Sequence, residues 1–150
     1  MADKAHEKPF IQFVYPSYDE LPDGLMFVGA IVDYVNQVHA VLPSRVRRNK
    51  VFTTAMATNY VKGGLTSPAI GRRYSRDHLS LLLFAATAKL CFLAEEVYWL
   101  AGKLFRPDDI RASHDNLKRA FDCAFAGKPS NTPAAAVARA LVDRIESLSE

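Results

Sequence analysis

Two short groups of polar and basic residues carry the most specific chemistry of this sequence. The first group follows Thr53, a residue type that caps helices, and consists of Thr54, Thr58, Asn59 and Lys62. The second group is the pair Arg72 and Arg73. Short polar side chains on a helix can read base edges in the DNA major groove, and arginines suit phosphates or the minor groove. Together the two groups predict DNA binding.

The distribution of charge favours the same chemistry. The chain has 150 residues and a net charge of +3, but residues 34–76 contain no Asp or Glu. The basic residues of this segment are Arg45, Arg47, Arg48, Lys50, Lys62, Arg72, Arg73 and Arg76. A polyanion-binding surface needs such a segment, because each carboxylate would repel phosphate. The alternative, that these side chains are scattered and solvated, stays open on charge alone.

The hydrophobic pattern predicts a mostly α-helical chain that could position both groups. Apolar residues recur at intervals of three and four, which is the period of a helix with one buried face. Helices are expected at about 24–42, 54–62, 76–90, 94–104, 108–126 and 134–148. We expect Thr53 or Thr54 and Ser75 to cap the second and third helices, and Gly63-Gly64 to end the second. Residues 66–74 should form a loop or a small hairpin.

The same pattern predicts a core. Val97, Trp99, Leu100 and Leu104 are expected to face inward. In the first helix the residues expected on the buried face are Leu25, Val28, Ile31, Val32, Val35, Val38 and Leu42. Near the N-terminus, Phe10, Phe13 and Tyr15 would pack on the body in extended chain. Cys91 and Cys123 lie among apolar residues and are expected to be reduced core cysteines. His78, in the first turn of its helix, is expected to be a surface or capping residue.

The central segment resembles a known family. Residues 54–65 read TAMATNYVKGGL, Pro68 follows, and residues 72–79 read RRYSRDHL. This run, together with LPDGLM over residues 21–26, resembles the bacterial domain of unknown function 1836. The resemblance extends from about Tyr15 to Leu104.

The same core has a more distant resemblance to MerR-type winged helix-turn-helix regulators. In those regulators the same features recur in the same order: a helix, a glycine turn, a proline, an arginine loop and a Tyr-Ser step. That resemblance implies a winged helix-turn-helix-like core with a small wing hairpin, cytoplasmic DNA binding as a homodimer, and transcriptional regulation. It assigns the recognition helix to Thr54, Thr58, Asn59 and Lys62, and the wing to Arg72, Arg73 and Tyr74. Residues 1–106 would form the DNA-binding region, with the 107–150 helical pair used for packing or dimerisation, as one compact unit.

The chain departs from the MerR pattern in one place. Residues 45–52 are basic and not clearly helical where that pattern has a short first helix. Either the helix over 24–42 serves as the first helix, or DNA docking is altered. In both cases Arg45, Arg47, Arg48 and Lys50 are expected to add phosphate contacts to double-stranded DNA.

Enzymatic chemistry is not indicated. The four histidines and two cysteines form no spaced metal motif, and no phosphate loop or nucleophile elbow is present, so we expect no catalytic residue, metal or cofactor. A second interpretation is that Tyr98 and Trp99 line a pocket for a small-molecule effector. The rival function is a protein–protein interaction module, partner of a regulator or anti-repressor, on a winged-helix scaffold without DNA binding.

Composition limits the remaining classes. Apolar residues make up 49% and charged residues 23%, which is typical of a globular domain and not of a disordered chain. No stretch of about 18 apolar residues could span a membrane. The N-terminal residues lack the apolar core of a secretory signal, which again favours the cytoplasm.

Overall fold

The structure is a computed structural model that describes residues 13–47 and 51–148. Within these ranges a single 3-10 turn, η2 (Tyr18–Glu20), precedes seven α-helices. They are α1 (Val28–His39), α2 (Ser44–Arg47), α3 (Thr54–Lys62), α4 (Arg76–Ala88), α5 (Ala94–Leu104), α6 (Ile110–Phe125) and α7 (Pro133–Leu148). No β-strand forms in the described ranges, so the mostly helical prediction is confirmed. The hairpin strands expected within 66–74 are absent from that segment.

The expected and observed helices differ most around α1. The prediction of 24–42 is too long, because Gly24 has a φ of +83° and the Met26 backbone pairs with Tyr74 instead of starting a helix. Leu25 is consequently exposed. The short α2 was not predicted; it begins just after Pro43, whose carbonyl accepts the Val46 N–H, and it buries the Val46 side chain.

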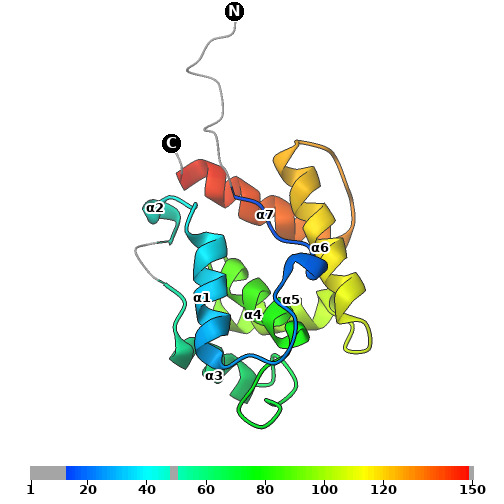
Figure 1. The fold of residues 1–150 in the computed structure, drawn as a ribbon. Coiled ribbons are helices and arrows are strands. Elements are labelled where there is room, and N and C mark those ends of the chain that lie inside the picture. The colour runs from blue at the N-terminus through cyan, green and yellow to red at the C-terminus, as the bar shows by residue number, and fades with distance from the viewer. Residues whose placement is uncertain (1–12, 48–50, 149–150) are drawn as a thin grey trace, which may run out of the picture.

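Helix α4 forms the centre of the core. All of its residues from His78 to Ala88 are buried, and α1, α5 and α6 pack around it (Figure 1). Buried apolar residues of all seven helices join one cluster with it. A nearly all-apolar helix needs partners on every side, and this one has them.

The extended N-terminal segment is part of that core. Phe13 and Tyr15 are buried, as predicted, and the Tyr15 ring stacks on Phe121 with centroids 4.7 Å apart. Burial raises the pKa of the Tyr15 phenol. Next to it, His114 Nε2 lies 2.8 Å from the Pro16 carbonyl and its Nδ1 lies 2.6 Å from Ser80 Oγ. The prediction for Phe10 falls outside the described residues.

The last two helices pack on the rest of the chain. Helices α6 and α7 have the most extensive contact between any two helices, and α7 also touches α2 and α5 (Figure 1). Leu141, Val142 and Ile145 of α7 are fully buried. No helix in the described residues is long and apolar enough to cross a membrane.

Trp99 and Cys91, also expected in the core, are on the surface as Leu25 is. The Trp99 side chain is 63% exposed, because the inward face of α5 carries Val97 and Ala101, and Trp99 is rotated about 200° from Val97. Cys91, just after α4, is also exposed, and Cys123 is half-buried; both are free thiols.

Candidate nucleic-acid interface

Helix α3 has the predicted bounds and cap. The Thr53 hydroxyl accepts the Met56 N–H at 3.2 Å, which satisfies one of the free N–H groups at the helix start. Ala57 is the one fully buried residue, so a small side chain lets α3 approach α1 closely. Tyr60 and Met56 are half-buried beside it, as expected for residues that seat the helix.

The outward face of α3 carries most of the predicted base-reading residues. Thr54, Asn59 and Lys62 are exposed. Thr58 differs from these three because it is half-buried. Its hydroxyl donates to the Thr54 and Ala55 carbonyls at 3.0 and 3.1 Å. A hydroxyl that donates to its own helix offers a ligand only its acceptor lone pairs. Thr58 is therefore the weakest of the four candidates.

The arginine pair lies in a tight two-residue turn. The Ile70 N–H donates to the Arg73 carbonyl at 2.8 Å, and the Arg73 N–H donates back to the Ile70 carbonyl at 3.1 Å. Gly71 and Arg72 between them have φ values of +59° and +29°, the signature of a type I′ turn. Arg72 is the non-glycine residue with positive φ in the described chain, a conformation that costs about 1–2 kcal/mol.

This turn is held against the start of α1. The Met26 N–H donates to the Tyr74 carbonyl at 2.8 Å and the Tyr74 N–H to the Met26 carbonyl at 2.7 Å. The Tyr74 side chain is buried edge-on against His78. Tyr74 was predicted to contact DNA; its ring is instead a packing residue that anchors the turn.

His78 connects the turn to α4. Its Nδ1 accepts the Ser75 N–H at 3.0 Å while the Ser75 hydroxyl caps the helix, so the predicted Ser75 cap and the capping role of His78 are confirmed. Nε2 lies 3.0 Å from the Ser67 carbonyl. The imidazole is buried within this network, so its position is structural.

Two exposed apolar residues beside the turn were not predicted. Phe27 is 60% exposed, and the Arg73 guanidinium lies over its ring, 4.8 Å from the centroid. Ile70 is 54% exposed. The helical spacing did not assign Phe27 to the buried face, and Ile70 falls in the expected loop, so neither residue was given a role from the sequence.

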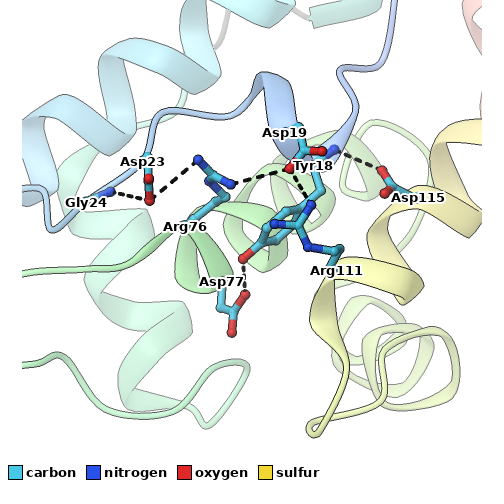
Figure 2. Close-up of polar contacts among 8 residues, drawn as sticks. All are labelled: Tyr18, Asp19, Asp23, Gly24, Arg76, Asp77, Arg111 and Asp115. Atoms are coloured by element: carbon cyan, nitrogen blue, oxygen red, sulfur yellow. Dashed lines mark hydrogen bonds and ion pairs between the residues drawn. The ribbon is translucent and has the colours of Figure 1, made fainter.

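Arg76, the last base of the acid-free segment, is used inside the protein (Figure 2). Its guanidinium lies 3.6 Å from Asp19 and 3.5 Å from Asp23, and its side chain is 17% exposed. It also lies over the Tyr18 ring, as does Arg111, which pairs with Asp19. The acidic N-terminal part of the chain therefore folds back onto one of the basic residues.

Tyr18 connects three elements within this cluster. Its backbone N–H donates to the Asp115 carboxylate of α6 at 2.9 Å, and its hydroxyl donates to Asp77 of α4 (Figure 2). Burial and the bond to Asp77 raise the pKa of Tyr18 to about 12. The cluster fixes η2 between α4 and α6, and two of its members, Arg76 and Asp77, follow the arginine turn closely in the sequence.

Two further predicted bases, Arg45 and Arg47, do not adjoin the turn. Helix α2, with Arg45 and Arg47, lies at the opposite end of α1 from α3 and from the loop through residue 74 (Figure 1). Arg47 is half-buried, and its Nε donates to the Leu42 carbonyl at 3.0 Å. Arg48 and Lys50 lie outside the described residues.

The predicted effector residues separate. Tyr98 lines a cavity of about 460 Å³ between the loop after α3, α4, α5 and the start of α6. Trp99 does not line it and points to solvent, with Lys103 Nζ 5.4 Å from its ring. Among the described residues, no three His, Cys, Asp or Glu side chains gather as metal ligands would.

Comparison with known proteins identifies a family for this arrangement. No protein of curated function matches the chain, and no solved structure matches it. A family described as a domain of unknown function, DUF1836, matches residues 16–121, from the segment before η2 into α6. This range includes α3, the arginine turn and the Tyr18 cluster, and the chain belongs to the DUF1836 family.

Proposed function

We propose that the chain is a sequence-specific, DNA-binding transcriptional regulator with a winged helix-turn-helix-like DNA-binding module. In this proposal α1 and α3 are the two helices, α3 enters the major groove, and the Ile70–Arg73 turn is a minimal wing. Asn59 and Thr54 read base edges, Lys62 contacts phosphate, and Arg72 and Arg73 hold the flanking backbone or minor groove.

The observation that carries the proposal is the conformation of Arg72. A tight turn of this type favours glycine or asparagine at its second position, yet an arginine with a φ of +29° stands there with its side chain exposed. Residues held in costly conformations gather at functional sites. This energetic cost is explained if the guanidinium at the tip of the turn binds another molecule, which in this proposal is DNA.

The position of the turn supports the same function. Backbone pairing of Met26 with Tyr74 holds the turn at the end of α1 where α3 packs (Figure 1). One module thus presents exposed polar groups on a helix and two arginines on a neighbouring turn. Arg45 and Arg47 at the far end of α1, a helix about 18 Å long, are left out of the proposed site.

We further propose a homodimer formed through α5. Glu95, Trp99 and Lys103 are exposed and spaced by four residues, so they lie along one side of the helix. Across a two-fold axis at Trp99, Glu95 of one copy would face Lys103 of the second copy, and the two tryptophans would meet. The two DNA-binding modules of the dimer would then contact the two halves of a two-fold symmetric operator.

The experiment that tests the proposed function is a fluorescence-anisotropy titration with a labelled pool of random duplex DNA. Binding that weakens steeply as salt rises is expected, because phosphate contacts release counterions. Selection from the bound pool would then give the operator.

A second candidate is supported by Phe27 and Ile70. Exposed apolar side chains beside a cationic turn also suit a protein partner. This candidate predicts no binding to the random pool at low salt, and loss of partner capture when Phe27 is replaced by serine.

A further inference from the structure

The cavity lined by Tyr98 has mainly apolar walls. Its volume, about 460 Å³, falls in the range of small-molecule sites. The apolar part of the wall is formed by Leu65, Leu81, Ala101, Phe105, Pro107 and Ile110. A ligand with a hydrocarbon or aromatic body would bury that surface.

A single charged group lines this cavity. Asp77 contributes a carboxylate, and no lysine or arginine is among the lining residues. One oxygen of that carboxylate accepts the Tyr18 hydroxyl, and within the described part of the chain Asp77 forms no ion pair. His78, also in the wall, accepts the Ser75 N–H through Nδ1. The wall therefore carries an unpaired negative charge.

Aromatic side chains complete the cavity. Tyr98 and Phe105 both line it, and the negative face of an aromatic ring attracts a cation. We propose that the cavity binds a small organic cation, an amine or quaternary ammonium with an apolar body, whose charge is placed between Asp77 and Tyr98. This site goes beyond the proposed function, since ligand binding needs no DNA.

The place of the cavity gives the ligand a route to the arginine turn. Gly64, Leu65, Thr66 and Ser67, which connect α3 to the turn, form one side of it, and α5 forms another. A bound ligand contacts both sides at once. Occupancy would fix the connection between α3 and the turn relative to α5.

The test uses the full chain and three probes of similar ring size: benzyltrimethylammonium, benzyl alcohol and benzoate. Calorimetric titration should give the tightest binding for the ammonium, by at least about tenfold, which corresponds to 1.4 kcal/mol. The Asp77→Asn variant should lose this preference. Gly102→Leu should lose all binding, because Gly102 lines the cavity and a Cβ there meets no atom within 4 Å, so the longer side chain can fill the space.

Two control variants separate charge from structure. Asp108→Asn removes an exposed carboxylate outside the cavity, and Tyr18→Phe removes the bond to Asp77 while leaving its charge. Both should bind benzyltrimethylammonium as the wild type does, and circular dichroism should show helix content unchanged in every variant. Equal affinity for benzoate and the ammonium, no binding of the ammonium, or unchanged binding in Gly102→Leu would overturn the proposal.

Discussion

The phenol of Tyr98 on α5 lies directly against Gly63, the residue at which α3 ends. A Cβ at position 63 would overlap Tyr98 Oη and stand 2.9 Å from Cζ. Gly63 has an ordinary helical φ of −77°, so this glycine is needed for space, whereas Gly64, with a φ of +88°, supplies the turn. The contact sets the end of α3 against α5 and the cavity.

Replacing Gly63 by alanine is therefore expected to destabilise the fold by about 1–3 kcal/mol, because the rigid Tyr98 ring must move. Urea unfolding measures the change. Adding Tyr98→Leu should recover part of the loss, so the two substitutions should be non-additive. Gly29→Ala is the matched control: a Cβ there meets nothing within 4 Å, and alanine in a helix should stabilise by about 0.5–1 kcal/mol. Equal losses at both glycines would contradict the contact.

Acid should destabilise the protein through His39. Burial, and to a lesser extent Arg47, lowers the pKa of this histidine from 6.5 to about 4. The folded chain thus holds it neutral, while the unfolded chain takes up a proton below pH 6.5, so stability is complete above that pH and falls as pH drops towards 4. At pH 5 the loss from His39 is about 2 kcal/mol.

Urea unfolding at pH 7 and pH 5 checks this. His39→Gln, which keeps a side-chain N–H donor near the Thr87 hydroxyl, should lose less stability over that interval than the wild type. His114, whose pKa is also lowered by burial, acts in the same direction and remains in both proteins. Identical pH dependence of the two proteins would argue against a buried neutral His39.

Asn59 is proposed to read bases, whereas the two arginines are proposed to contact the DNA backbone or minor groove. Replacing Asn59 should therefore change sequence preference. Asn59→Ala is expected to cost about 1–3 kcal/mol on the selected operator and little on random DNA, since an amide reads bases. Asn131→Ala, in the exposed α6–α7 loop, is the control and should leave both affinities unchanged. Equal losses on operator and random DNA would remove Asn59 from base reading.

The proposed dimer can be tested by exchanging charges. Glu95→Lys and Lys103→Glu should each prevent self-association, whereas an equimolar mixture of the two variants should form a heterodimer, because every facing pair then has opposite signs. Sedimentation measures the assembly, and the single tryptophan of the chain, Trp99, should shift its emission to shorter wavelength on association. A mixture that stays monomeric would contradict the two-fold contact.

The sequence predicted those parts of the fold that depend on neighbouring residues. Thr53 and Ser75 cap their helices through side chains three residues from their partners, so local chemistry sufficed. Tyr74 and Arg76 follow the arginine turn and looked like part of its surface. Contacts with Met26, Asp19 and Asp23, about fifty residues away, turn them inward, and no local pattern contains that information.

The prediction that Trp99 lies in the core was wrong for a different reason. Its hydrophobic type favoured the core, but Val97 and Ala101 already occupy the inward face of α5. Helix geometry alone places a residue two positions from Val97 on the far side. For Trp99, helical phase predicts the position of the side chain better than its hydrophobic type does.

The proposed DNA binding depends most on Arg72 and Arg73, and the most direct test compares wild type with Arg72→Ala/Arg73→Ala on random duplex DNA at several salt concentrations. The double variant is expected to bind more weakly at every salt concentration, and its slope of log affinity against log salt should be smaller by about two. Arg106→Ala/Arg119→Ala, which removes the same charge from two exposed sites elsewhere, should bind nearly as the wild type does. Equal binding and equal slopes for wild type and the Arg72/Arg73 variant would contradict the account.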